Sequence, residues 1–482
     1  MILRAGKIAL EAMGALLAGA AVIAGVIGYR LAYEGPIHLG FLKPYVEEAI
    51  NRPGAEFQFI VQDTVLTWAG WERTLDIRAV GVQVQNASGQ ELASVPELGF
   101  GLSGAALFRG LIAPSRIELF RPELTLARNE HGDFQFGETL IGETDPAKST
   151  QATQTDFLAA LVRELLNPPD PEKRTGYLTE AAIYDGTISI DDRHAGNVWK
   201  AEQLEIHLAR GERGLAGTYK ADVPQFGDPA RLGGDVFLPA GGDRFEVKAR
   251  LQRFAAPAIG LIETGLAILA NADVFLEGEA QTTVSLKGEL GVTEFSLSGS
   301  DGQIALPDLM KAPLPITALT AQGRVDPDLD LISLDNLSLN LDGPTLELSG
   351  VGDGFLGGKA TDDGAPALTA TLKGNGIDWQ KLDGWWPETV AADARGWLIP
   401  NITSGIVENL VAKTKLRFAK NEKPSVQVEE LGGTFKAHDL TVHYLRPMPP
   451  IEHGVATASF DSKQFAARIQ GGDVGKITLG NG

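Results

Sequence analysis

The chain has 482 residues, too many for one compact core, so several domains or one elongated repetitive body are expected. Hydrophobic residues make up 44% and charged residues 22%, which excludes wholesale disorder, and 57 glycines with 26 prolines favour short strands joined by turns. The net charge of −20 argues against nucleic-acid binding, and the absence of cysteine excludes disulfides, thiolate nucleophiles and cysteine metal sites.

An uncharged run near the N-terminus predicts a membrane anchor. Residues 12–29 (AMGALLAGAAVIAGVIGY) are long enough to cross a hydrocarbon core of roughly 30 Å. Arg4 and Lys7 precede this run, so the positive-inside rule places residues 1–11 in the cytoplasm and the body on the other side. A cleavable signal peptide is the alternative, but the run is longer than a usual signal core and has no single obvious cleavage site. We therefore expect an uncleaved transmembrane helix.

Short helices are expected at three places along the chain. Residues 41–50 place apolar side chains at helical spacing directly after the anchor. Residues 139–155 are polar and read as a linker, and an amphipathic helix with its apolar stripe on one side follows before Pro168. Residues 257–270 are too long and too apolar for a turn, so they predict a further helix.

Most of the remaining chain alternates apolar and polar residues, which is the pattern of β-strands with one apolar face. The clearest examples lie between residues 272 and 352, and glycine or proline closes most of them. Buried strands of a parallel sheet would be apolar throughout, so an antiparallel sheet is expected. Its apolar face either packs on a second sheet or a helix, or remains open as a long curled groove. Candidate groove residues are Ile188, Ile190, Ile332, Leu334, Leu337, Leu339, Leu346 and Leu348.

A tryptophan-rich element lies between residues 385 and 405, which read WWPETVAADARGWLIPNITSG. This segment resembles the W-P…R-x-W-[LI]-x-x-N-[IL]-x-x-G element of the AsmA-like superfamily, in particular its YhdP-type branch. The strand and YLRPMPP segment over residues 435–450 resemble the segment downstream of the element in that branch. The matching positions are Trp386, Pro387, Arg395, Trp397, Leu398, Asn401, Ile402 and Gly405. The plain interpretation of Trp385, Trp386 and Trp397 is structural, with their rings holding a helix on the sheet.

The resemblance implies a bridge-like lipid-transfer protein. Relatives of this kind are implied to be anchored in the bacterial inner membrane and to cross the periplasm with a hydrophobic β-groove, along which phospholipids move towards the outer membrane. They are also implied to be much longer, whereas this sequence stops within a strand pattern at Gly482. We therefore expect either a shortened relative that needs a protein partner to complete the bridge or an incomplete sequence.

Residues that would indicate an enzyme or a metal site are not found. The seven histidines form no H-E-x-x-H pair, and neither G-x-S-x-G nor a P-loop occurs. The G-x-G-x-x-G match at 352–357 precedes a sequence that cannot begin a helix. No catalytic residue, cofactor or metal is therefore predicted.

The sequence thus predicts a mainly β protein with an N-terminal transmembrane helix, an elongated twisted antiparallel sheet curled into a groove, and a few short helices. The expected segments are 1–11 cytoplasmic, 12–29 anchor, 30–138 helix and first groove part, 139–175 linker and amphipathic helix, 176–373 central groove, 374–410 tryptophan-rich helical element and 411–482 C-terminal strands. The expected function is phospholipid transfer that supports the outer-membrane barrier. The alternative is a scaffold or quality-control factor for outer-membrane protein assembly, in which the sheet edge binds client strands.

Overall fold

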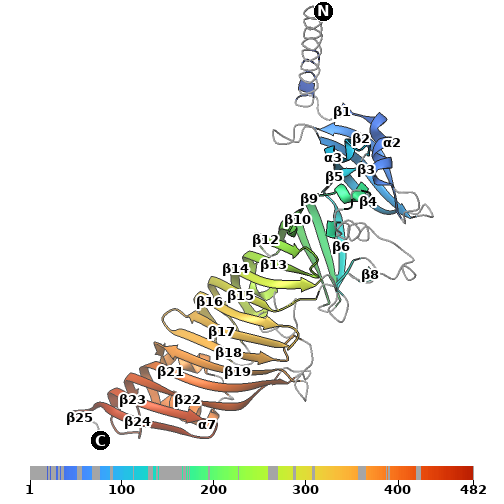
Figure 1. The fold of residues 1–482 in the computed structure, drawn as a ribbon. Helices are drawn as coiled ribbons and strands as arrows, with labels where there is room; N and C mark the ends of the chain where they lie inside the picture. Colours follow the sequence, from blue (N-terminus) through green and yellow to red (C-terminus); the bar gives the residue numbers. More distant parts are fainter. Residues whose placement is uncertain are drawn as a thin grey trace, which may run out of the picture.

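The computed structural model describes most of residues 37–140 and 170–480, with gaps, together with isolated positions between 19 and 33 and residues 165 and 166. In these parts of the chain the strands join into one continuous sheet, and the helices are few and short. Figure 1 shows an elongated molecule in which the strands succeed one another like rungs towards the C-terminal end. The prediction of a mainly β fold with a long sheet is confirmed.

An N-terminal group of strands forms the first part of the sheet. Its elements are β1 (Ile37–His38), η1 (Gly40–Leu42), α2 (Lys43–Ile50), β2 (Phe57–Thr67), β3 (Asp76–Asn86), β4 (Glu91–Leu102), α3 (Gly104–Leu107) and β5 (Pro114–Phe120). Each of these strands pairs antiparallel with the next. The helix predicted over 41–50 corresponds to η1 and α2. Val46 packs on the apolar core, and Glu47 Oε1 accepts a hydrogen bond from the Val61 backbone N–H at 3.0 Å.

The sheet is mixed, so the prediction of a purely antiparallel sheet is wrong at one place. The strands concerned are β6 (Glu123–Arg128) and β9 (Glu180–Asp192), while β7 (Phe134–Phe136), β8 (Thr139–Leu140) and η2 (Arg174–Tyr177) lie between them in sequence. Both β5 and β6 run parallel to β9, with β5 beside its first half and β6 beside its second. The Arg121 N–H donates to the Tyr184 carbonyl at 2.8 Å, which holds the bend between β5 and β6 against β9. The long segment before β9 supplies the crossover that parallel pairing requires.

From β9 onward the strands form a ladder of antiparallel neighbours. The strands are β10 (Asn197–Gly211), β11 (Gly214–Val223), β12 (Ala230–Pro239), β13 (Arg244–Ala255), β14 (Ala272–Ser285), β15 (Thr293–Ile304), β16 (Leu314–Asp326), β17 (Leu331–Asn340), β18 (Thr345–Asp353), β19 (Ala367–Asn375), β20 (Ile377–Asp378), β21 (Ile402–Ala419), β22 (Ser425–Val442), β23 (Ile451–Asp461), β24 (Phe465–Val474) and β25 (Ile477–Leu479). Three short helices separate β20 from β21, namely η4 (Trp379–Lys381), α6 (Leu382–Trp385) and α7 (Ala392–Asn401). Each long strand pairs with its neighbour in sequence, and β19 and β20 both pair with β21. The spatial order of the ladder therefore follows the sequence.

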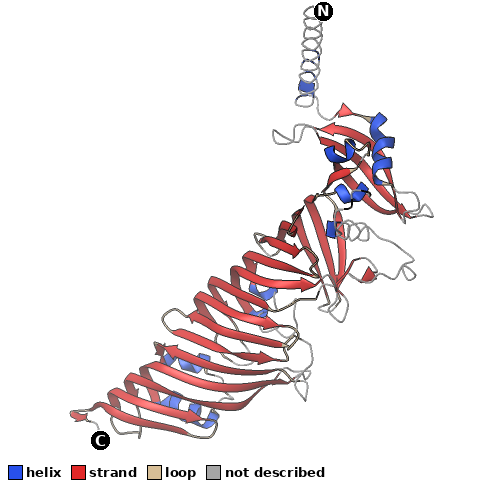
Figure 2. Ribbon diagram, viewed as in Figure 1, coloured by secondary structure: helices blue, strands red, loops and turns tan. Residues whose placement is uncertain are grey.

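Buried apolar side chains form three clusters along the molecule. The first joins β2 to β5 with β9 to β12, the second lies around β14 and β16, and the third lies between η4, α7 and β20 to β23. Figure 2 shows the short helices lying against one side of the ladder. Among the described residues, the clusters and the helices leave much of that side without a second layer.

The predicted anchor, residues 12–29, lies largely outside the described residues, as does most of the linker and helix predicted over 139–175 and of the helix predicted over 257–270. Within the part of the chain that the structure describes, no helix has both the length and the apolar character needed to cross a membrane.

Candidate functional site

The groove residues predicted on β17 and β18 lie on one face of the sheet. The pairs in register are Ile332–Gly352, Leu334–Gly350, Leu337–Leu348 and Leu339–Leu346. Directly opposed residues of neighbouring strands share a face. Between Leu334 and Leu337, two residues of β17 stand opposite one residue of β18. This bulge keeps both halves of β17 turned the same way, although the spacing from 334 to 337 is odd.

The groove residues predicted on β9 lie on the same face. Ile188 stands opposite Ala201 of β10, and Ile190 stands opposite Trp199. Both strands carry an irregularity beside this point, with left-handed backbone at Asp185 and Gln203. Beyond these irregularities, a series of directly opposed residues connects β9 to β17, and every member of such a series lies on the same face. The series is Ile183, Ile206, Tyr219, Gly234, Ala249, Ala280, Phe295, Gly323 and Leu334. All eight predicted groove residues therefore share one face of the ladder.

A row of apolar residues runs along this face at right angles to the strands. In strand order from β11 to β24 it consists of Ala221, Leu232, Leu251, Gly278, Leu297, Ala321, Leu337, Leu348, Leu372, Ala412, Gly433, Phe460 and Phe465. Every member is apolar or glycine. Most of the large side chains in the row are half-buried rather than buried. We call this set the apolar row.

The opposite face of the ladder is polar and is crossed by ion pairs. Lys220 Nζ lies 2.9 Å from Glu205 Oε2 on the neighbouring strand, and Arg250 reaches Asp235 at 3.3 Å and Glu279 at 3.5 Å. These pairs link β10 to β11 and β12 to β13 and β14. Opposite charges placed across neighbouring strands stabilise a sheet. Charged side chains of this kind are suited to a face that is in contact with solvent. The ladder is therefore an amphipathic sheet, with one polar face and one apolar face.

In the part of the chain that the structure describes, helical segments cover the apolar face at three places. Near β10, Leu165 is buried in the first cluster and its carbonyl accepts a hydrogen bond from Arg210 Nε at 2.8 Å. Near β14, Ala256 is buried in the second cluster at the start of a helical segment. At the C-terminal part, η4, α6 and α7 lie over the row, and we call these three helices the tryptophan cover. The cover occupies the position of the predicted 374–410 element.

The tryptophan cover is held together by Arg395. This guanidinium, whose side chain is only 12% exposed, donates to the Trp386 carbonyl at 3.2 Å, to the Asp383 carbonyl at 2.8 Å and to Asp383 Oδ1 at 2.6 Å. Arg395 thereby ties α7 to the end of α6. The cover is also tied to the loop before β16, because the Ala312 N–H donates to the Gly384 carbonyl at 3.1 Å and Lys311 Nζ lies 2.8 Å from Glu388 Oε1.

A cavity of about 620 Å³ lies beneath the cover, within the size range of small-molecule sites. Its apolar lining residues include Leu346, Leu372, Leu410, Ala412, Phe435, Phe460, Phe465, Trp379, Trp385 and Trp386. Four of these, Leu372, Ala412, Phe460 and Phe465, belong to the apolar row. The cavity is therefore a covered section of the apolar face rather than a separate pocket.

Trp379 is the residue of this site that the sequence analysis missed. Its side chain is only 3% exposed, it lines the cavity, and its Nε1 has no hydrogen-bond partner among the described residues. A buried donor without an acceptor costs about 1–3 kcal/mol. Asp378 accepts the Gln380 N–H at 2.9 Å and so begins η4, which places the ring of Trp379 inwards. The Ile377-Asp378-Trp379 order, a strand end followed by a capping residue, is the local signal that could have identified it.

The other residues of the predicted element have separate roles. Asn401 Nδ2 donates to the Trp397 carbonyl at 2.8 Å at the end of α7. Gly405 has φ +144°, and a Cβ there would lie 2.5 Å from Leu440 Cδ2. Trp386 packs on the third cluster, as the structural interpretation expects, but Trp397 is 48% exposed and does not. Pro387 lies outside the described residues.

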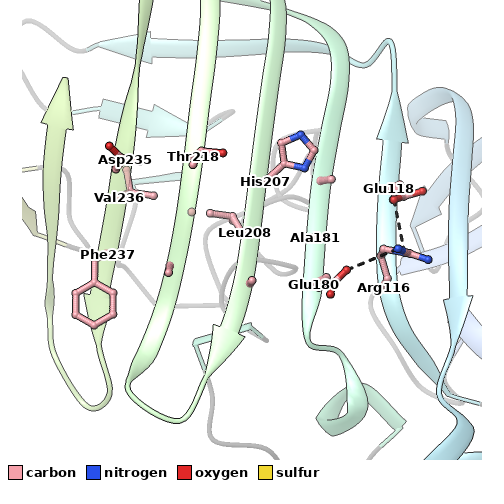
Figure 3. A pocket seen from close by; sticks show the side chains of 14 residues that line it. Arg116, Glu118, Glu180, Ala181, His207, Leu208, Thr218, Asp235, Val236 and Phe237 are labelled. Carbon is pink, nitrogen blue, oxygen red and sulfur yellow. Dashed lines mark ion pairs between the residues drawn. The ribbon is translucent and has the colours of Figure 1, made fainter. Parts of the chain in front are cut away.

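A second hollow of about 550 Å³ lies on the polar face, across β5 and β9 to β12 (Figure 3). Arg116 is placed between two carboxylates there, with Nε 3.5 Å from Glu118 Oε1 and a terminal nitrogen 3.8 Å from Glu180 Oε2. His207 and Asp235 lie further along the same hollow. In the described parts of the chain no group of three histidine or acidic side chains is arranged to hold a metal ion. The hollow thus brings an arginine and two carboxylates together on the polar face.

Comparisons of the chain with models of protein families, with curated proteins and with solved structures find no match. The resemblance of residues 385–405 to the AsmA-like element remains a prediction.

Proposed function

We propose that this chain carries phospholipids along the apolar face of its ladder, between the inner and outer membranes of a bacterial envelope. In this proposal the acyl chains lie on the apolar row and the head groups remain in water. The protein acts as a passive path without a catalytic site or cofactor. The observation that carries the proposal is the apolar row itself, which is unbroken from β11 to β24.

The length of the row favours a path over a single binding site. At about 4.8 Å per strand, the row extends over roughly 60 Å. The acyl region of one membrane leaflet is about 15 Å deep, half of a hydrocarbon core of ~30 Å. Several lipid molecules can therefore lie side by side along the apolar row. A soluble protein that bound one ligand would need only a fraction of it.

The contrast between the two faces also supports lipid as the occupant. A contiguous apolar surface of this extent, whose large side chains are only half-buried, is rare on soluble proteins and marks an interaction site. Half-buried leucines such as Leu337 and Leu348 lose water when an acyl chain lies on them, which is worth roughly 25 cal/mol for each Å² covered. The gain is non-directional, so lipids can move along the row without breaking specific contacts.

The anchor predicted over residues 12–29 and the AsmA-like resemblance supply the remaining parts of the proposal. The anchor places the start of the ladder at the inner membrane, and the resemblance implies the periplasm and the outer membrane as its surroundings. Support of the outer-membrane barrier follows from a supply of phospholipid.

A pair of neighbouring residues on β18 allows a direct test. A photo-crosslinking amino acid is placed at Leu348, on the apolar face, and in a matched protein at Glu347, on the polar face. After irradiation of living cells, adducts are identified by mass spectrometry. Lipid at Leu348 and none at Glu347 is the expected result. Protein adducts at Leu348 without lipid would instead favour the scaffold for outer-membrane protein assembly.

A further inference from the structure

The cavity beneath the tryptophan cover differs from the rest of the apolar face, because it is roofed and because polar groups line it together with the apolar row. The turn between β23 and β24 contributes Asp461, Ser462, Lys463 and Gln464 to the lining, and the beginning of α7 contributes Asp393. A covered apolar cavity with a few polar groups is the usual form of a specific lipid or small-molecule site.

The size of the cavity matches one acyl chain. A methylene group has nearly the same volume as a water molecule in the liquid, ~30 Å³. The 620 Å³ of the cavity therefore hold roughly 20 methylene groups. This is the length of one long fatty acyl chain and too little for both chains of a diacyl lipid. A two-chain lipid can therefore place one chain beneath the cover while the other stays on the open face.

The charged groups of the lining fit a head group with both signs of charge. Lys463 and Asp393 are exposed, and neither has an ion-pair partner among the pairs found in the described residues. Asp461 differs, because its Oδ1 already accepts the Lys463 and Gln464 backbone N–H groups, both at 2.7 Å. The lining thus carries one cation, Lys463, which also interacts with the charge of Asp461, and a second carboxylate, Asp393, with no ion-pair partner among the described residues.

Trp379 supplies a further feature that points to a ligand. Its buried indole N–H lacks an acceptor, and unsatisfied buried polar groups in native structures call for an explanation such as an absent ligand. The ester carbonyl of an acyl chain is an acceptor of the required kind. Nε1 is shielded in the present arrangement, so a contact with the ester carbonyl requires the cover to shift when the cavity fills.

We propose that the cavity beneath the tryptophan cover is a binding site for one acyl chain of a zwitterionic glycerophospholipid, with Lys463 at its phosphate, Asp393 at its ammonium group and the Trp379 indole N–H at its ester carbonyl. This inference rests on the proposed function and adds a head-group preference to it. In this proposal the cavity beneath the cover selects lipids by head group, whereas the rest of the apolar face does not.

The test uses the full chain with a photo-crosslinking phenylalanine analogue at Phe465, which lines the cavity, and a second protein with the analogue at Leu348, outside the cavity lining. Both are produced in cells whose membranes contain phosphatidylethanolamine and phosphatidylglycerol. The masses of the adducts give the ratio of the two lipids at each site. We expect the ethanolamine-to-glycerol ratio at Phe465 to exceed that at Leu348 by roughly twofold to fivefold, the effect of one exposed ion pair.

Three variants separate the contributions of the individual groups. Lys463→Gln and Trp379→Phe should each lower the adduct yield at Phe465 several-fold without changing the yield at Leu348, whereas Asp393→Asn should abolish the excess of ethanolamine lipid. Lys413→Gln, which alters an exposed cation of β21 outside the cavity lining, serves as the control and should change neither.

The outcomes distinguish this inference from the function on which it rests. Three results would overturn the inference and leave the proposed lipid path intact, provided that lipid is found at Leu348. They are no lipid at Phe465, free fatty acid alone at Phe465, or equal lipid ratios at the two sites. No lipid at either position overturns both. Unchanged adducts at Phe465 in Lys463→Gln and Trp379→Phe refute the assigned contacts.

Discussion

Replacement of Arg395 by methionine should loosen the tryptophan cover without unfolding the ladder. The guanidinium makes three hydrogen bonds that tie α7 to α6 and the residue after it. Two of these bonds go to backbone carbonyls, and Arg395 itself is largely buried, whereas its carboxylate partner Asp383 is 54% exposed and adds little. Hydrogen bonds to charged groups contribute roughly 1.5–3 kcal/mol each, so loss of the set, partly replaced by water, should cost about 2–4 kcal/mol.

Hydrogen exchange of the α7 peptide measures this loss locally. A ladder whose strands contact only their neighbours opens in parts, so the global unfolding curve would dilute the effect. A cost of about 2–4 kcal/mol corresponds to roughly 30- to 700-fold faster exchange over residues 392–402. Arg395→Lys should lie between methionine and the parent, because an ammonium group cannot reach all three acceptors.

The control is Lys413→Met, which removes an exposed cation from β21 and leaves the cover untouched. Exchange in the β10 and β11 peptides, whose buried residues belong to a different cluster, should stay unchanged in all three variants. If α7 exchanges less than threefold faster in Arg395→Met, the cover is held by its apolar contacts alone, and the role assigned to Arg395 is wrong.

Three further predictions concern other parts of the molecule. Leu348→Asp places an unpaired charge in the apolar row and should lower the phospholipid that co-purifies with the chain, measured as lipid phosphorus, whereas Glu347→Gln should not. Gly405→Ala forces a residue with a Cβ into φ +144° and should destabilise the region of α7 and β21 by about 1–3 kcal/mol, measured by hydrogen exchange of the peptides from this region. Burial raises the pKa of Glu97, but its hydrogen bonds with Arg78 and Arg121 outweigh burial and lower the pKa below its ordinary value of 4.5. The stabilisation by Glu97 is therefore present above that value and lost as the pH falls through the lowered pKa, so the stability deficit of Glu97→Gln, about 1–3 kcal/mol at pH 7, should shrink in acid.

The apolar face could be predicted from sequence because alternation is a local property. Leu346 and Leu348 flank Glu347, and this pattern alone assigns them to one side of a strand. The agreement between Leu334 and Leu337 is less direct, since their odd spacing puts them on opposite faces of a regular strand. Only the bulge on β17 reconciles them, and its position depends on pairing with β18.

The features that escaped prediction depend on contacts between distant segments. The parallel pairing of β5 and β6 with β9 is set by a crossover whose path the strand pattern does not contain. Trp379 and Trp397 are similar in sequence terms, yet one is buried over the cavity and the other is exposed on α7. Trp379 packs inwards from η4 and Trp397 lies on the outer side of α7, and the packing of these helices on the sheet is a tertiary arrangement. The sequence pattern therefore indicates which face is apolar but not where that face is roofed.

Because the strands of the ladder pair in sequence order, the length of the sheet is set by the number of its strands. Because each long strand from β10 to β19 pairs with the strand that follows it, one added hairpin lengthens the sheet by two strand spacings, roughly 10 Å, and disturbs only the junction where it enters. A hairpin adds strands in pairs, so the side chains beyond the insertion keep their assignment to the polar or the apolar face. Gene duplication of a single hairpin can thus lengthen the sheet by one fixed step, and the loss of a hairpin shortens it by the same step.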